Sequence, residues 1–206
     1  HPVLPIFIYD QNIISKLKDN DHRLFYINQS IKKMNVVLQK NNKSIHCLEG
    51  KPLDVFSELI KKYRINKVYT NRDYTPYSKK RDKSISKFLI NNNIEFIDFK
   101  DHVLFEKNEI TKDDGSPYRV YTPYSKKWIK KMNELGVQEY NSEKLIDNFI
   151  DINTIPFNSK INIISSNINF LKTNISKKII ENYESTRNFP SLDATSKVGV
   201  ELRFGT

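Results

Sequence analysis

The chain has 206 residues, of which 38% are hydrophobic and 12% aromatic, so it can bury a core and is not a disordered protein. No apolar run approaches the roughly 20 residues of a membrane span, and no leader-like segment opens the chain. We therefore expect a cytoplasmic protein with no membrane partner. The formal net charge is +10, but the basic residues are spread along the chain, so charge alone leaves nucleic-acid binding open.

Cysteine and histidine usage excludes two kinds of site. Cys47 is the only cysteine, so no internal disulfide can form, and we expect it to be a small buried residue. The four histidines show no spacing typical of metal ligands, so no metal site is expected.

The first elements alternate between strand and helix. Residues 3–10 are almost continuously apolar, as in a strand buried on both faces, and residues 44–48 predict the next strand. Between them, apolar residues at spacings of three and four predict a helix with one buried stripe. The stripe consists of Leu24, Ile27, Ile31, Met34 and Leu38. Pro52 opens a second helix, whose apolar side consists of Leu53, Phe56, Leu59, Ile60 and Tyr63.

The same alternation continues with a strand at residues 67–70. A polar turn follows, and Thr75 and Pro76 then provide an N-cap and a first residue for a helix that ends at residues 91–93. The buried side of that helix is predicted to be Ile85, Phe88 and Leu89. Residues 94–98 and 103–105 are predicted strands. Four alternations of strand and helix predict an α/β domain with a doubly wound parallel sheet.

The heptapeptide YTPYSKK occurs at residues 74–80 and again at residues 121–127. Both copies place Thr and Pro at a helix start, so two similar N-caps explain the repeat better than a duplication does. Each copy also places two lysines near a helix N-terminus, where anions are favoured. Lysines that are merely solvated are the alternative.

The second half of the chain is predicted to be less regular. Thr122 and Pro123 begin a helix that reaches residue 135, and residues 137–173 form a long connector with a short helix at 142–149. Residues 176–183 form another helix. We expect a second domain to begin there.

Four stretches, in this order, resemble the photolyase and cryptochrome family. They are N-R-D-Y-x-P-Y-x-x-x-R-D at residues 71–82, G-S-P-Y-x-V-Y-T-P-Y-x-x-x-W at 115–128, R-N-F-P at 187–190 and T-S-K-V-x-x-x-L-R-F-G-T at 195–206. The resemblance covers nearly the whole chain and keeps the family's spacing. It implies a Rossmann-like antenna domain at residues 1–136, an interdomain linker at 137–173 and the start of an all-α FAD-binding domain at 174–206.

The sequence departs from the family in two places. The first strand of the family and its W-F-R-x-D-L-R-type turn are not matched, and the resemblance ends before the part that holds most of the flavin. We therefore expect a fragment whose sheet is interrupted at one strand and which alone neither retains FAD nor repairs DNA. Trp128 matches a position in a helix of the antenna domain, where core packing is its expected role.

The resemblance implies a deoxyribodipyrimidine photolyase, a light-driven lyase that repairs cyclobutane pyrimidine dimers in DNA. Blue light excites reduced FAD, which passes one electron to a dimer flipped out of the duplex. Damaged DNA is the implied partner of the whole protein, and a monomer is expected. The alternative within the family is a cryptochrome that senses blue light without repair. From another class, the α/β half could be an electron-transfer flavoprotein or adenine-nucleotide-binding domain.

The resemblance also implies the binding residues. Those that match the family's flavin contacts are Tyr183, Thr195, Ser196, Lys197 and Val198, whose hydroxyls and backbone N–H groups suit a diphosphate. From pattern alone, a Ser/Thr cap without a ligand is the alternative. An antenna pigment, which could be a folate, a deazaflavin or a flavin, is expected at the carboxyl edge of the sheet. The candidates there are Tyr9, Asp10, Asn71 and Arg72. No catalytic residue is assigned.

Overall fold

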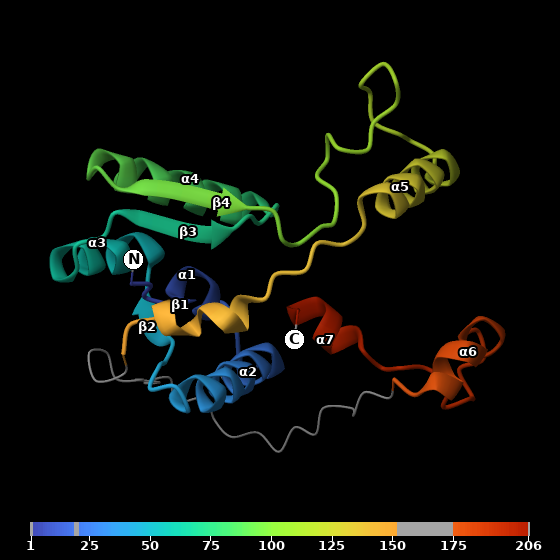
Figure 1. Ribbon diagram of the computed structural model, residues 1–206, viewed down its shortest axis with the longest axis horizontal. Helices are drawn as coiled ribbons and strands as arrows, with labels where there is room; N and C mark the ends of the chain where they lie inside the picture. The colour runs from blue at the N-terminus through green and yellow to red at the C-terminus, as the bar shows by residue number, and fades with distance from the viewer. Residues whose placement is uncertain (1, 19–20, 152–174, 206) are drawn as a thin grey trace. The chain divides into compact units, whose positions relative to one another are not determined.

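The computed structural model describes residues 2–18, 21–151 and 175–205 (Figure 1). The chain divides into two compact units. The first unit consists of His1–Pro5, Ile13–His46 and Phe149–Thr206, and the second consists of Ile6–Asn12 and Cys47–Asn148. The second unit holds almost all residues of the strands.

The strands form two separate pairs within the described residues. β1 (Ile6–Asp10) pairs with β2 (His46–Gly50), and β3 (Lys67–Asn71) pairs in parallel with β4 (Glu95–Phe99). The α/β class and the parallel pairing are therefore confirmed, while one continuous doubly wound sheet is not. The split into two pairs agrees with the expectation of an interrupted sheet.

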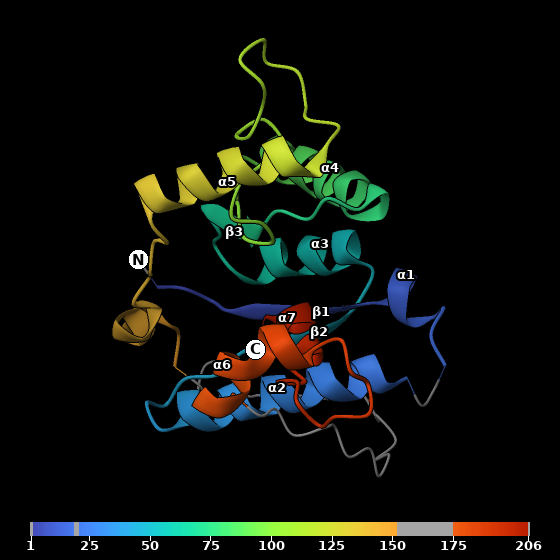
Figure 2. The same cartoon turned by 90° about the vertical axis from the view of Figure 1, so that its right-hand side faces the viewer.

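Two helices supply the core beside the β3–β4 pair. α3 (Pro52–Lys62) and α4 (Pro76–Asn91) contact each other, and α4 also contacts β4 (Figures 1 and 2). Both helices begin with the predicted proline. The buried apolar side chains here are Val55, Phe56, Leu59, Ile85, Leu89 and Ile94. Leu89 is 0% exposed, so the predicted buried side of α4 is confirmed at its centre.

The helix in the first unit corrects one predicted stripe. α2 (His22–Gln39) buries Ile31 and Leu38, but Met34 is 48% exposed. Asn35 is buried instead, and its side-chain oxygen accepts a hydrogen bond from the backbone N–H of Ile45 at 2.9 Å. A polar side chain that satisfies the backbone just before β2 therefore takes the place that the spacing gave to methionine.

The predicted strand at residues 103–105 is wrong. Those residues lie in a loop, where the ring of Phe105 packs edge-on against Trp128 with centroids 5.4 Å apart. Phe105 thus packs against α5 (Tyr121–Leu135) without strand pairing. α5 also begins before the predicted cap, with Val120 as N-cap, and leaves Thr122 in the first turn. Trp128 packs as expected of a structural residue.

The remaining elements are short. α1 (Gln11–Ile14) follows β1, and the 3₁₀-helix η1 (Ser142–Asn148) matches the predicted short helix. Residues 149–151, which follow η1, are held by the buried Lys43. Its Nζ donates hydrogen bonds to Phe149 O and to Asp151 Oδ1, both at 2.7 Å. Most of the predicted connector, from residue 152 onward, lies outside the described residues.

Residues 175–205 contain only helices. α6 (Lys177–Thr186) confirms and extends the predicted helix, and α7 (Gly199–Phe204) follows it. Neither helix has a fully buried residue. A search of the described residues found no helix of the length and apolarity that crossing a membrane requires.

Candidate functional site

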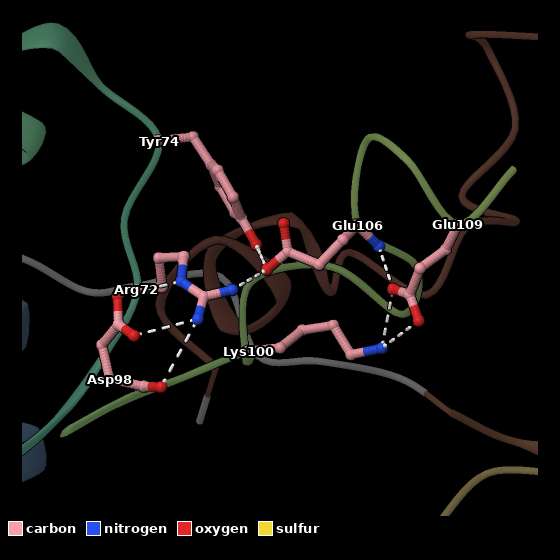
Figure 3. Close-up of polar contacts among 6 residues, drawn as sticks. All are labelled: Arg72, Tyr74, Asp98, Lys100, Glu106 and Glu109. Carbon is pink, nitrogen blue, oxygen red and sulfur yellow. Dashed lines mark hydrogen bonds and ion pairs between the residues drawn. The ribbon is translucent and has the colours of Figure 1, made fainter. Parts of the chain in front are cut away.

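Arg72 is the centre of a polar network at the carboxyl ends of β3 and β4 (Figure 3). Its Nε and Nη2 donate to the two carboxylate oxygens of Asp98 at 3.0 and 2.9 Å. Its Nη1 donates to Oε1 of Glu106 at 2.6 Å. Such two-pronged pairing fixes the guanidinium plane. The adjacent Asn71 donates from Nδ2 to Asp101 at 2.8 Å.

Glu106 connects this network to the loop that leads to α5. It accepts a hydrogen bond from Tyr74 Oη at 2.7 Å, and its backbone N–H donates to the carboxylate of Glu109. Lys100 Nζ also donates to Glu109, at 2.9 Å to Oε2. Lys131 of α5 donates to the backbone oxygen of Glu109 at 2.8 Å. The network therefore runs from the end of β3 to α5.

The acidic groups of the network are stabilised as carboxylates. Hydrogen bonds from Arg72 lower the pKa of Asp98, and those from Tyr74 and Arg72 lower the pKa of Glu106. The backbone N–H of Glu106 and the Lys100 ammonium lower the pKa of Glu109. The hydrogen bonds from Arg72 to Asp98 and Glu106 in turn raise the pKa of Arg72. The arrangement is charged and internally satisfied at neutral pH.

The end of β1 is held by the first turns of α4. Tyr77 Oη donates to Asp10 Oδ2 at 2.5 Å, and the backbone N–H of Asn12 donates to Asp10 Oδ1 at 2.9 Å. The preceding residue, Tyr9, is only 3% exposed, and burial, followed by the nearby Cys47, raises its pKa to about 12. Tyr9 is thus a core residue.

The start of α4 matches the sequence prediction closely. Thr75 Oγ1 accepts a hydrogen bond from the backbone N–H of Ser78 at 3.2 Å, as an N-cap should. Asp73 accepts hydrogen bonds from the backbone N–H of Thr75 at 3.0 Å and from Ser78 Oγ at 2.8 Å. The turn between β3 and α4 is therefore pre-formed by its own side chains.

The predicted flavin contacts lie in and after α6. Tyr183 is 44% exposed, and the guanidinium of Arg187 lies 5.8 Å from its ring centroid. Thr195, Ser196 and Lys197 are half-buried. Lys197 pairs with Asp193 at 2.5 Å and has a positive φ of 57°, which is uncommon for a residue with a side chain.

The donor set of this segment suits an anionic cofactor. Two hydroxyls and an ammonium stand in consecutive positions, and Val198 is the N-cap of α7. A backbone held at positive φ is a feature of ligand-holding turns. Thr195 to Val198 are consecutive in the chain, whereas the ring of Tyr183 lies against the guanidinium of Arg187.

The four antenna candidates fall into two groups. Asp10 is held by Tyr77, whereas Asn71 and Arg72 are held by Asp101, Asp98 and Glu106. The sequence prediction missed the partners in both groups. Asp98 could have been found, because it ends a predicted strand as Asp10 does. Glu106 lies in an irregular loop and gave no such signal.

The described chain thus combines parallel strands that carry polar groups at their ends with helices that follow them in the sequence. Residues 1–142 match the family model described as DNA photolyase. The chain belongs to the DNA photolyase family.

Named relatives agree with this assignment. The chain is 26% identical over 202 residues to a deoxyribodipyrimidine photo-lyase of Alkalihalophilus pseudofirmus, a match that covers 87% of this chain and 40% of the relative. It is 21% identical over 226 residues to a deoxyribodipyrimidine photo-lyase of Synechococcus sp., covering 98% of this chain and 46% of the relative. Cryptochrome-1 of Macaca fascicularis is 27% identical over 141 residues, covering 67% and 24%. The chain thus spans less than half the length of these relatives.

Solved structures support the fold. A bacterial class III photolyase from Agrobacterium tumefaciens superposes with a TM-score of 0.66 at 20% identity, covering 100% of this chain and 45% of the other. An archaeal photolyase from Sulfolobus tokodaii superposes with a TM-score of 0.64 at 19% identity, covering 99% and 46%. At these identities the likeness establishes the architecture alone.

Proposed function

We propose that this chain is the N-terminal portion of a deoxyribodipyrimidine photolyase, a light-driven, FAD-dependent lyase that repairs cyclobutane pyrimidine dimers in DNA. The observation that carries the proposal is that two photo-lyases match across 87% and 98% of the chain. Both matches extend past residue 142, where the family model ends, and the match that covers 98% of the chain includes the helical segment with the proposed flavin contacts.

The proposed division of labour follows the resemblance. Residues 1–136 serve as the antenna domain, 137–173 as the linker and 174–206 as the start of the FAD-binding domain. The whole protein acts as a cytoplasmic monomer. The all-helical secondary structure of the described part of residues 174–206 supports the last of these assignments.

FAD is proposed to be held by Tyr183, Thr195, Ser196, Lys197 and Val198. When bound, it supplies the light-driven electron that opens the cyclobutane ring. The hydroxyls of Thr195 and Ser196 donate hydrogen bonds to the diphosphate, and the Lys197 ammonium adds positive charge there. Asp193, which pairs with Lys197 at 2.5 Å, fixes the position of that ammonium. These residues bind and orient the cofactor and do not carry the bond-breaking step.

A second chromophore is proposed at the carboxyl ends of the strands. The Sulfolobus tokodaii photolyase is described with two FAD molecules and an implied light-harvesting cofactor. The side chains of Asn71 and Arg72 are already occupied by acidic partners. Their proposed role is therefore to shape the edge of the site, with the pigment contacting the turn that they hold.

The repair activity can be tested on the protein at its natural length. The purified protein is mixed with an oligonucleotide that contains one pyrimidine dimer, and repair is measured in blue light and in darkness. We expect light-dependent loss of the dimer. Intact flavin photoreduction with no loss of the dimer would overturn the proposal.

The flavin contacts can be tested separately by FAD affinity. Thr195→Val and Ser196→Ala each remove one donor, and each is expected to weaken FAD binding by about tenfold, the value of a hydrogen bond to a charged group. Ser191→Ala, an exposed hydroxyl a few residues upstream, is the matched control and is expected to leave affinity unchanged. Equal affinities in all three variants would contradict the assignment.

A cryptochrome-type blue-light receptor is the second candidate. It is favoured by the match to Cryptochrome-1 of Macaca fascicularis, which covers 67% of this chain. That match spans 141 residues, fewer than the photo-lyase matches. Photoreduction of the flavin without repair is the outcome that would select this candidate.

A further inference from the structure

The outer face of α4 carries a row of four lysines. Lys79, Lys80, Lys83 and Lys87 are all exposed. At 3.6 residues per turn they lie within an arc of about 100°, and at 1.5 Å per residue the row is about 12 Å long. The buried residues Ser78, Ile85 and Leu89 lie on the opposite side of the helix. The row therefore belongs to the solvent face of a helix whose other face is fixed in the core.

These lysines differ in their partners from three of the four lysines of α5. In α5, Lys127 pairs with Asp113 at 3.0 Å, Lys130 lies 3.9 Å from Glu134, and Lys131 donates to a backbone oxygen. Among the described residues, no ion pair is found for any of the four α4 lysines. The one acid of α4, Asp82, pairs with Arg81 at 2.7 Å. The α4 row is thus an uncompensated strip of positive charge.

The geometry of the row favours nucleic acid over a membrane surface. A helix that lies on a bilayer inserts an apolar face between the headgroups, but the apolar face of α4 is buried in the protein core. A phosphate backbone needs only regularly spaced cations, and the row, at about 12 Å, matches the width of the B-DNA major groove between its two lines of phosphates.

We propose that the α4 lysine row is a docking surface for the phosphate backbone of duplex DNA, independent of base sequence and of damage. It increases the time that the protein spends on undamaged DNA, because backbone contacts of this kind support sliding and hopping. The row contains none of the residues proposed to hold the flavin. Its function does not require light, FAD or a lesion.

The test uses the natural-length protein in darkness with an undamaged, fluorescently labelled 20-bp duplex. Affinity is measured by anisotropy between 50 and 200 mM salt. The variant K79Q/K80Q/K83Q/K87Q is compared with K32Q/K33Q/K40Q/K51Q, which removes the same charge from exposed lysines elsewhere. Glutamine keeps a high helix propensity, and far-UV circular dichroism verifies that both variants are folded.

The α4 variant is expected to reduce the slope of log affinity against log salt by about 3.6, since each lysine–phosphate contact contributes about 0.9. Between 50 and 200 mM salt, the factor by which the wild-type affinity falls should therefore be about a hundred times larger than the factor for the α4 variant. The control is expected to keep the wild-type slope. Equal slope changes in both variants would overturn the proposal by showing an effect of net charge alone. Loss of binding to phosphatidylserine vesicles with an unchanged DNA slope would assign the row to membranes instead.

Discussion

The β3–α4–β4 region and the helical segment at residues 175–205 are held together in different ways. The first is built around the fully buried Leu89 and is closed at its strand ends by the Arg72 network. In the second, α6 and α7 have no fully buried residue, and ion pairs such as Lys177–Glu181 at 3.6 Å link neighbouring turns of chain. A ring contact ties α7 to α2, with the centroids of Phe204 and Tyr26 4.9 Å apart. Short helices without a buried face are marginal in water.

This difference separates a pre-formed scaffold from a segment that needs a partner. The β3–α4–β4 region has the buried contacts that stabilise it without a ligand. Residues 175–205 expose large apolar side chains, including Ile180 at 59% and Leu202 at 78%. Under the proposed function, FAD supplies part of the missing contact, so binding and ordering of this segment are coupled.

The largest expected difference in stability comes from replacing one leucine by alanine in each region. Leu89→Ala should lower the free energy of unfolding by about 2–5 kcal/mol, because it removes fully buried methyl groups and leaves a cavity. Leu202→Ala, at a 78% exposed position, should change it by less than about 0.5 kcal/mol. Urea denaturation measures both. Similar losses would show that the two regions do not differ in packing.

The helix N-caps provide a smaller test of the same comparison. Thr75→Ala removes the acceptor for the backbone N–H of Ser78 and should cost about 1 kcal/mol of global stability. Ser176→Ala removes the corresponding acceptor in α6, where the distance from Ile179 N is 3.4 Å. It should reduce the helicity of α6 with little change in the urea midpoint. A larger midpoint shift for Ser176→Ala would reverse the comparison.

Acid should loosen the Arg72 network. The pKa values of Asp98 and Glu106 are lowered from their ordinary 3.8 and 4.5. A lowered folded-state pKa stabilises the network above the ordinary value, and that stabilisation is lost as pH falls through the folded-state pKa. Amide exchange of residues 100–110, corrected for intrinsic rates, should therefore accelerate below about pH 4. Unchanged protection down to pH 2 would contradict the role of these carboxylates.

Removing Arg72 should reproduce that loosening at neutral pH. In Arg72→Met, Asp98 and Glu106 lose their shared cation. The pKa of Asp98 should rise toward its ordinary value, and that of Glu106 should rise less because its hydrogen bond from Tyr74 remains. NMR titration of the two carboxylates measures the rise. Lys67→Met, which breaks the exposed pair with Glu95, is the control and should leave both titrations unchanged.

Local rules predicted the elements whose signals lie close together in the sequence. The start of α4 at Thr75 and Pro76 and its end at residues 91–93 follow from capping and from the apolar period, and the structure confirms them. The strand predicted at residues 103–105 failed because the ring of Phe105 packs against Trp128, 23 positions later in the chain. The burial of Asn35 in place of Met34 likewise depends on a residue outside the helix, because Asn35 accepts a hydrogen bond from the backbone N–H of Ile45.

The candidate site shows the same limit. Arg72 could be proposed from its position after a strand, but its partners Asp98 and Glu106 lie 26 and 34 residues away. Parallel pairing of β3 with β4 explains Asp98, because it places the two strand ends side by side. Glu106 depends on the path of the loop after β4, which no periodic pattern specifies.

Hydrogen exchange of the natural-length protein with and without FAD tests the central claim most directly. We expect FAD to slow amide exchange in α6 and α7 at least tenfold while changing β3, α4 and β4 by less than about twofold, because the proposed contacts are confined to the helical segment. If FAD binds and the exchange of residues 177–204 does not change, the assignment of this segment to the flavin site is contradicted.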